Sequence, residues 1–201
     1  QIYWNEGKLT REIIKDYAEQ YYQHVKAFPR YISATHSICE DIEKRRILLE
    51  NLQDEENKDG DHPKLWKNFA KSLGADENEI EKAKLDWFTK DMIDNFFTQA
   101  RKSYAEGLAS LYTYERQIPE IAETKINGLK KFYGVNSKEG LEFFEAHKSA
   151  DVIHRAECEK LLDSLSKEEQ EKAETASLLT ARYLWNFLSG MTTKHNLQKA
   201  A

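Results

Sequence analysis

Apolar residues recur every three or four positions along most of this chain, which is the spacing of one face of an α-helix. The first such stripe begins after Thr10, a candidate N-cap, and continues to Val25. Pro29 lacks a backbone N–H and is expected to end this helix. A second helix is predicted over residues 31–56, where a polar run ends it. The chain is therefore expected to open with two helices that separate at the proline.

Five further helical segments follow, and capping residues, glycines and prolines mark their limits. A helix start is predicted at Asp61 and a stop at Gly74. Gly107 and Pro119 are expected to kink or divide the longest segment. The predicted segments are residues 61–74, 76–84, 89–134, 137–165 and 166–190.

The whole pattern indicates a helical bundle. No stretch alternates apolar and polar residues as a half-buried strand does, and no internal repeat or linker divides the chain. A chain of 201 residues can bury one sizeable core, and only 8 Gly and 3 Pro interrupt it, which favours long helices. The sequence therefore predicts an all-α fold, a single compact bundle of about seven helices that forms one domain over residues 1–201.

Charge and hydropathy exclude several classes of protein. Lysines and glutamates are interspersed and the formal net charge is -5, so no basic face for nucleic acid is expected. No apolar run approaches the ~20 residues of a membrane span, and the charged start is not that of a signal peptide. Two cysteines, Cys39 and Cys158, indicate a reducing, cytoplasmic setting. Because the first residue is not Met, a trimmed chain is expected.

One segment carries ligand-type residues at helical spacing. His147, Asp151 and His154 fall at positions i, i+4 and i+7, within about 60° of one helix face. Such a face can give several ligands to metal ions, and Asp151-x-x-His154 has the carboxylate-x-x-His spacing of di-iron helix bundles. The alternative interpretation is a polar surface stripe with two solvated histidines.

Residues elsewhere could complete a metal site. Glu115 borders the apolar side of its segment, where an unpaired charge is costly. Glu55 and His62 flank the break between two predicted helices, and each can point inward from a helix end. Glu55 also stands in an acidic run, residues 54–56, of the kind that is usually solvated. Mixed carboxylate and imidazole ligands suit Fe(II), Mn(II) or Zn(II), and spacing alone does not choose among them.

Six motifs spread over essentially the whole chain together match a known family. They are Trp4-Asn5-Glu6-Gly7-Lys8-Leu9-Thr10, His24-Val25-Lys26-Ala27-Phe28-Pro29-Arg30-Tyr31, Leu48-Leu49-Glu50-Asn51-Leu52, Asp54-Glu55-Glu56, Tyr114-Glu115-Arg116-Gln117-Ile118-Pro119 and His147-x3-Asp151-x2-His154. With them the chain resembles the haem-oxygenase-like di-iron oxidases of the TenA/PqqC superfamily. Within it, the resemblance is greatest to the group of the chlamydial protein associating with death domains and its bacterial relatives, the 4-aminobenzoate synthases. The resemblance implies a haem-oxygenase-like fold.

The resemblance also implies a set of metal ligands. One metal would be held by Glu55, His62 and His147, and the other by Glu115, Asp151 and His154. The glutamate at 55 is chosen over its neighbour because the family separates this residue from its histidine by six residues. The family further implies two Fe ions, or Mn with Fe, and O2 as co-substrate.

The family's activity implies a second group of residues. These proteins make 4-aminobenzoate for folate synthesis by cutting the product from one of their own tyrosines, with a lysine as amino donor, so that each chain turns over once. The lysine matches Lys125, and tyrosines near the metals match Tyr17 and Tyr114. Without the resemblance, Lys125 would be interpreted as a surface residue and the two tyrosines as packing residues.

Two positions depart from the family's pattern. Its N-terminal tyrosine falls on Gln1, and a further pocket tyrosine falls on Phe143. The consumed residue would then be Tyr17 or Tyr3, or a tyrosine beyond a trimmed end, unless the activity differs.

Three alternatives stay open. The fold could serve a di-metal oxygenase that acts on an external fatty or amino-acid substrate, or a TenA-like thiamine-salvage hydrolase. The hydrolase is disfavoured because neither Cys39 nor Cys158 falls in its nucleophile position. The chain could instead be an effector that binds host death domains, which would involve secretion into a host cell. A homodimer is expected from the resemblance alone.

Overall fold

In the computed structural model the backbone is described for residues 2–197, and so are their side chains except those of residues 149–154. Every regular element in this part of the chain is a helix, which confirms the all-α prediction. There are ten helices there rather than about seven, because several predicted segments divide and short helices are added. The elements are α1 (Ile2–Asn5), α2 (Arg11–Ser37), α3 (Ile42–Glu55), α4 (His62–Ser72), α5 (Glu77–Glu81), α6 (Trp87–Lys102), α7 (Tyr104–Glu115), α8 (Ile118–Phe132), α9 (Lys138–Asp163) and α10 (Lys167–Lys194).

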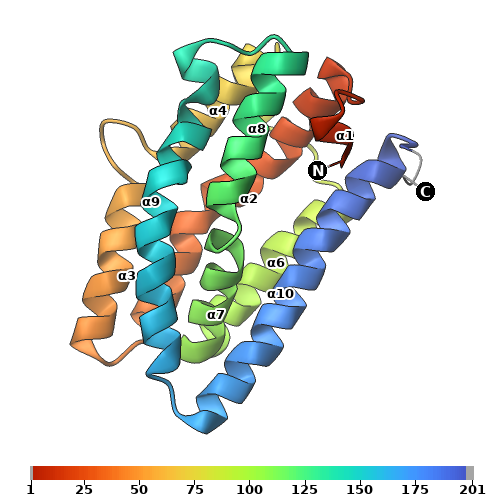
Figure 1. Ribbon diagram of the computed structural model, residues 1–201. Coiled ribbons are helices and arrows are strands. Elements are labelled where there is room, and N and C mark those ends of the chain that lie inside the picture. Colours follow the sequence, from red (N-terminus) through yellow and green to blue (C-terminus); the bar gives the residue numbers. More distant parts are fainter. Residues whose placement is uncertain (1, 198–201) are drawn as a thin grey trace.

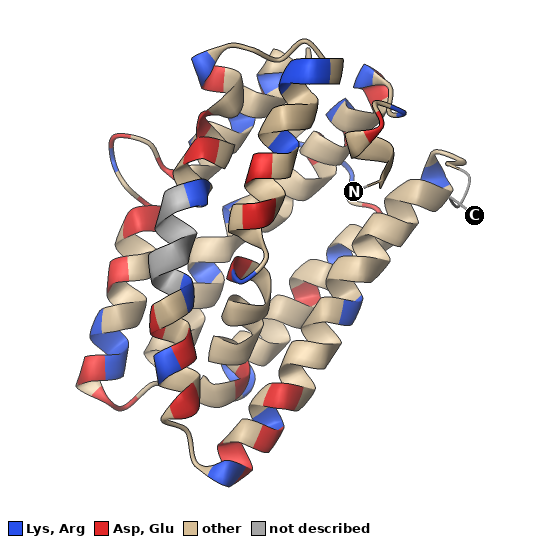
Figure 2. Cartoon of the chain, viewed as in Figure 1, with Lys and Arg blue, Asp and Glu red and all other residues tan. Residues whose placement is uncertain are grey.

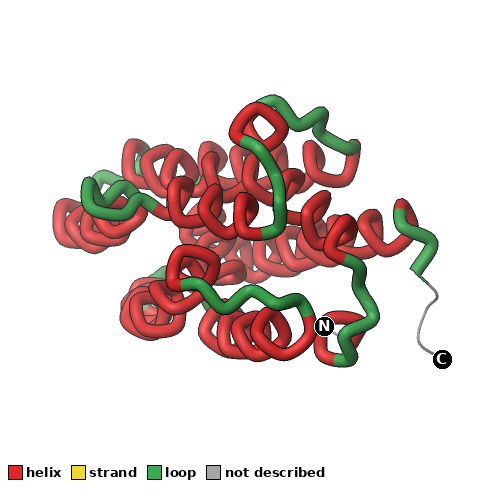
Figure 3. Tube along the Cα trace, turned by 90° about the horizontal axis from the view of Figure 1, so that it is seen from above, coloured by secondary structure: helices red, strands yellow, loops and turns green. Residues whose placement is uncertain are grey.

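The long helices pack along their lengths around a shared core. Helix α2 contacts α3, α4, α5, α6 and α7, while α9 packs on α4, α7 and α8, and α10 on α6 and α7. In Figure 1, α3 and α9 lie on one side of the bundle and α6 and α10 on the other. Seen from the end of the bundle in Figure 3, helices make up most of the chain and loops join them. Both ends of the described chain lie at the same end of the bundle.

The predicted break at Pro29 is wrong, because α2 continues through it to Ser37. Proline inside a helix removes one backbone hydrogen bond and costs about 3 kcal/mol or more. The residues around it, among them Phe28 and Ile32, are buried in the core. Burial of this face therefore outweighs the local cost of the proline.

The helix predicted over residues 31–56 is instead two helices. Helix α2 ends at Ser37, and α3 begins after Asp41. The Asp41 carboxylate accepts hydrogen bonds from the backbone N–H groups of Glu43 and Lys44, at 2.9 and 3.1 Å. This N-cap satisfies two of the amides that a new helix leaves unpaired, and it fixes where α3 starts.

The sequence predicted a kink or division at Gly107 and a helix end near Gly190, and both predictions are wrong. Gly107 lies inside α7, and the divisions fall on either side of that helix, at Ser103 and before Pro119. Gly190 lies inside α10, which continues to Lys194. A β-carbon at Gly107 would collide with the Thr35 side chain, and one at Gly190 with a phenylalanine ring. Both glycines therefore permit close helix packing rather than chain breaks.

In the view of Figure 2, Lys and Arg positions are interspersed with Asp and Glu positions along the helices, and neither sign gathers in one region. This arrangement agrees with the interspersed charges of the sequence. In the described part of the chain, no helix is both long enough and apolar enough to cross a membrane.

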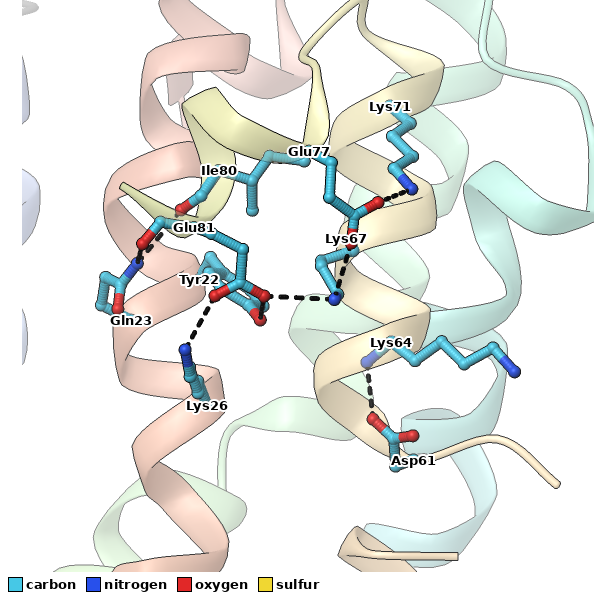
Figure 4. Close-up of polar contacts among 10 residues, drawn as sticks. All are labelled: Tyr22, Gln23, Lys26, Asp61, Lys64, Lys67, Lys71, Glu77, Ile80 and Glu81. Atoms are coloured by element: carbon cyan, nitrogen blue, oxygen red, sulfur yellow. Dashed lines mark hydrogen bonds and ion pairs between the residues drawn. The ribbon is translucent and has the colours of Figure 1, made fainter. Parts of the chain in front are cut away.

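A group of polar contacts around Glu81 joins α2, α4 and α5 (Figure 4). The Glu81 carboxylate accepts a hydrogen bond from the Tyr22 hydroxyl at 2.6 Å and pairs with the ammonium groups of Lys26 and Lys67 at 2.7 and 3.2 Å. Hydrogen bonds from Lys26 and Tyr22 lower the pKa of Glu81 to about 2. Three helices are thus held together by one ionised carboxylate.

We expect Glu81→Gln to lower the free energy of unfolding by about 1 kcal/mol at neutral pH, because these charge-assisted bonds are partly exposed to solvent. The folded-state pKa of Glu81 lies below its ordinary value of 4.5, so this stabilisation is present above that pH and is lost as the pH falls towards 2. Urea unfolding of both proteins between pH 2 and 7 measures the difference. Glu168→Gln is the control, because its ion pair with Lys172 is exposed and its removal should change stability little. A difference that does not shrink with falling pH would contradict the assignment.

Candidate metal centre

Three ligand-type side chains from three helices converge inside the bundle. Glu55 is the last residue of α3, His62 the first of α4, and His147 lies in the middle of α9. Their exposed fractions are only 4%, 5% and 3%. One ligand atom of each lies within 4.8 Å of those of the other two. This is the arrangement of a metal-binding triad.

Local sequence fixes the two ligands at the helix ends. The Asp61 carboxylate accepts a hydrogen bond from Lys64 N at 2.8 Å, and Pro63 occupies the first turn of α4, so the helix starts at His62. Glu55 is turned into the core, whereas Glu56 is exposed. The acidic run of residues 54–56 is therefore solvated only in part.

The hydrogen bonding of the histidines fits a metal ion. The Nδ1–H of His147 donates to the carbonyl of Phe143 at 2.7 Å, which leaves Nε2 as the ring nitrogen that carries a lone pair. Metal-binding histidines characteristically make such a bond to a backbone carbonyl. His62 Nδ1 lies 2.8 Å from Glu55 Oε2 and is buried, yet it has no hydrogen-bond partner among the described residues. The three side chains lie close enough together to bind one metal ion.

The charge of Glu55 raises the pKa of His62. Burial alone would lower the pKa of His62, but the neighbouring Glu55 carboxylate outweighs it and raises the pKa. The buried Glu55 carboxylate thus favours positive charge beside it, and a metal cation could take a place between these two side chains and the His147 ring.

Glu115, at the end of α7, is held by donors from two other helices. It is buried, and Asn51 Nδ2 on α3 donates to its Oε1 at 2.7 Å. The thiol of Cys158 on α9 donates to its Oε2 at 3.7 Å. Burial, and then the charge of Glu115, raises the pKa of Cys158, so the thiol keeps its proton. The carboxylate is therefore fixed in orientation from both sides.

Asp151 and His154, the other two predicted ligands, belong to residues 149–154, whose side chains lie outside the described part of the structure. Their helix, α9, is the one that brings His147 into the triad and Cys158 to Glu115. The second metal site consequently stays a prediction of the resemblance.

Lys125 and Tyr17 lie side by side, although their helices are far apart in sequence. The Lys125 ammonium nitrogen lies 3.5 Å from the centre of the Trp4 ring system and 4.6 Å from that of Tyr17. No carboxylate pairs with it in the described part of the chain. Burial lowers the pKa of Lys125 to about 7. A large fraction of this lysine is therefore an uncharged, nucleophilic amine at neutral pH.

Two cavities meet at this pair. One, of about 110 Å³, lies between α1, α2, α8 and α10 and is lined by Tyr3 and Trp4 among others. The second, of about 130 Å³, extends towards Tyr114. Tyr17 and Lys125 line both cavities. Neither cysteine of the chain lines either of them, so no thiol nucleophile is available there.

The three predicted tyrosines differ in their relation to Lys125. Tyr17 and Tyr3 border the first cavity with it, and Tyr17 and Tyr114 border the second. The hydroxyl of Tyr114 is hydrogen-bonded with that of Tyr21. Phe143 occupies a position where the family has a tyrosine, and its ring centre lies 4.1 Å from that of His147.

Two polar residues near these sites were missed by the sequence analysis. Asn51 lies four residues before Glu55, so helical spacing could have placed it on the same face. His24 is fully buried among aromatic rings, its Nε2 has no partner among the described residues, and burial lowers its pKa to about 3. No local signal distinguishes this histidine, because its surroundings come from α6 and α7 as well as α2.

The chain matches a protein family and several named relatives over most of its length. The family model described as an iron-containing redox enzyme matches residues 15–185. A 4-aminobenzoate synthase of Chlamydia trachomatis is 41% identical over 93% of this chain and 81% of its own length. A protein of the same name from Nitrosomonas europaea is 40% identical over 94% of this chain and 82% of its own.

Solved structures show the same fold at low sequence identity. A TenA homologue of Pseudomonas syringae superposes with a TM-score of 0.82 at 16% identity, covering 95% of this chain and 83% of its own. A protein from Nostoc punctiforme, described as similar to the chlamydial death-domain-associating protein, gives 0.77 at 16% identity and covers 92% and 84%. These likenesses confirm the haem-oxygenase-like fold expected from the sequence.

We expect His147→Ala to remove a metal ion from the triad, because the ring supplies one of three convergent ligands. Removal of a residue that only hydrogen-bonds a metal ligand weakens metal binding roughly 10–100-fold, and the loss for His147→Ala should be larger. Metal content after anaerobic dialysis against Fe(II) measures it. His36→Ala, a partly exposed histidine outside the triad, is the control and should keep the full content. Equal metal contents in the two variants would exclude the triad.

We expect the Lys125 amine to titrate near pH 7, because burial penalises its charged form. Between this value and the ordinary 10.5, the unfolded chain holds a proton that the folded chain lacks, so the free energy of unfolding rises with pH across that window. Side-chain NMR of ¹⁵N-labelled lysines follows the titration. Lys125→Met should abolish it and flatten the pH dependence of stability. A Lys125 signal that stays protonated up to pH 10 would refute the buried, unpaired amine.

Proposed function

The chain belongs to the haem-oxygenase-like family of iron-containing redox enzymes, and on that premise we propose that it makes 4-aminobenzoate with O2 at a two-metal centre. Carbon would come from its own Tyr17 and nitrogen from Lys125. The observation that carries the proposal is the contact between these two residues beside shared cavities. The names of relatives with about 40% identity support the same product.

The proposed centre uses six residues. Glu55, His62 and His147 would hold one metal, and Glu115 with Asp151 and His154 the other. Two iron ions, or manganese with iron, would supply the electrons that reduce O2 and the oxidising power for the reaction. The buried triad and the hydrogen-bonded Glu115 support this assignment.

The covalent change can be written from the structures of tyrosine and product. In 4-aminobenzoate, the ring and Cβ of the tyrosine are retained and Cβ becomes the carboxylate carbon, so the Cα–Cβ bond breaks. The phenolic C–O bond is replaced by a C–N bond at the same ring carbon, and the phenolic oxygen leaves as water. The Cε–Nζ bond of the lysine then breaks as Cε is oxidised to an aldehyde, which releases the nitrogen with the ring. O2 is the net oxidant and, with water, the source of the carboxylate oxygens. The lysine nitrogen must therefore reach the hydroxyl-bearing end of a tyrosine ring.

Three residues of this chain favour that reaction. Burial keeps a large fraction of the Lys125 amine uncharged, so its lone pair is available for attack on an oxidised ring. Burial also raises the pKa of Tyr17 well above its ordinary value, so the phenol stays protonated until it is oxidised. The Trp4 ring covers a second side of the amine.

Tyr17 is proposed as the consumed residue over Tyr3 and Tyr114. Among the described residues, the Lys125 amine is in contact with the Tyr17 ring, and both residues border both cavities. Gln1, where the family has its N-terminal tyrosine, lies outside the described residues. Neither an external substrate nor a death-domain partner would explain the placement of Lys125 against Tyr17. A homodimer is expected from the resemblance, and a cytoplasmic location is expected from the composition.

We expect the purified chain, loaded with Fe(II) or with Fe(II) and Mn(II), to release at most one 4-aminobenzoate per chain on exposure to O2 and a reductant. No substrate is added. Protein labelled with ¹³C-tyrosine and ¹⁵N-lysine should give product that carries both labels, as measured by mass spectrometry. Unlabelled product, or product formed only with an added substrate, would contradict the proposal.

We expect Lys125→Arg and Tyr17→Phe each to reduce product release by more than about 100-fold. The first removes the amine that gives the product its nitrogen, and the second removes the phenol that must be oxidised. Lys130→Arg, an exposed lysine on the same helix, and Tyr183→Phe on α10 are the matched controls. Full product release by Tyr17→Phe together with loss in Tyr3→Phe would move the carbon source to Tyr3.

A further inference from the structure

We propose that Asn51 is a positioning residue of the metal centre, which ties the Glu115 carboxylate to the helix that carries Glu55. The inference rests on the proposed two-metal function. It assigns to α3 a role in both halves of the centre, as the source of one ligand and as the support of another.

The contacts of Glu115 carry this inference. Asn51 Nδ2 donates to Glu115 Oε1 at 2.7 Å, and the thiol of Cys158 donates to Oε2 at 3.7 Å. All three residues are buried. Each oxygen of the carboxylate is thus engaged by a separate helix, α3 on one side and α9 on the other.

Helical geometry connects the two halves. Asn51 precedes Glu55 by four residues within α3, so the two side chains share one face of that helix. A displacement of α3 would move the Glu55 ligand and the donor to Glu115 together. The Asn51 hydrogen bond therefore couples the position of a ligand in the triad to the orientation of the carboxylate proposed for the second metal.

The amide oxygen of Asn51 argues against a role in packing alone. A carboxylate only accepts hydrogen bonds, so the nitrogen of Asn51 must face Glu115. Its Oδ1 is then buried without a hydrogen-bond partner among the described residues. A buried, unsatisfied carbonyl is unfavourable, and an apolar side chain of similar size would avoid it. The amide is explained if its nitrogen is needed by Glu115 and its oxygen accepts from water within the centre.

Asn51→Leu tests the assignment, with Asn95→Leu as the matched control. Asn95 is also buried on a helix. Its Nδ2 donates to Thr180 Oγ1 at 3.2 Å and its Oδ1 accepts from Gln99 Nε2 at 3.3 Å, and neither partner is a predicted ligand. Each variant thus loses a buried amide together with its side-chain hydrogen bonding, one bond to Glu115 for Asn51 and two bonds for Asn95. Bound iron per chain is measured after anaerobic dialysis against graded Fe(II) concentrations, and the Mössbauer spectrum identifies the ions that remain.

We expect wild type and Asn95→Leu to bind two ions. Asn51→Leu should keep one ion with an unchanged spectrum and bind the second about 10–100-fold more weakly, as is typical when a partner of a metal ligand is removed. Two ions bound by Asn51→Leu with wild-type affinity would overturn the inference, and so would equal losses in both variants. If Asn51→Leu does not fold, Asn51→Ala, which cannot clash, takes its place. Wild type that binds no second ion would instead refute the proposed two-metal centre.

Discussion

The interior of this bundle depends on the compensation of buried charge. Glu55 and Glu115 lie in a setting where an isolated carboxylate is strongly unfavourable. Each is matched by donors or ligand atoms from other helices: His62 for Glu55, and Asn51 and Cys158 for Glu115. These contacts require α3, α4, α7 and α9 to meet at one place, so the polar centre constrains the arrangement of the helices around it.

Lys125 shows the opposite solution to the same constraint. No carboxylate compensates its ammonium group in the described part of the chain, and the rings of Trp4 and Tyr17 lie against it instead. Desolvation disfavours the charged form of this unpaired amine and lowers its pKa to about 7. Buried carboxylates among ligand-type side chains and a partly uncharged amine beside Tyr17 thus give one small domain both a region suited to a cation and a candidate nucleophile.

The helix limits show how far local signals reach. The N-caps at Thr10, Asp61 and Ser166 act within one turn, and the structure has helices that start directly after or at these positions. Pro29 was expected to end a helix but lies within one, because the residues around it are buried against α6 and α7. Its local cost is outweighed by contacts with helices that are distant in the sequence.

The sequence alone determined the helical class, the types of ligand and their spacing, because periodicity and capping are properties of neighbouring residues. His147 could be placed on one face with Asp151 and His154 from the helical repeat alone. Only the tertiary structure decided that Glu55 turns inward while Glu56 is solvated, that Asn51 supports Glu115, and that Lys125 meets Tyr17. Each of these depends on how helices far apart in the chain pack against one another. A local pattern cannot encode the position of a residue that is distant in the sequence.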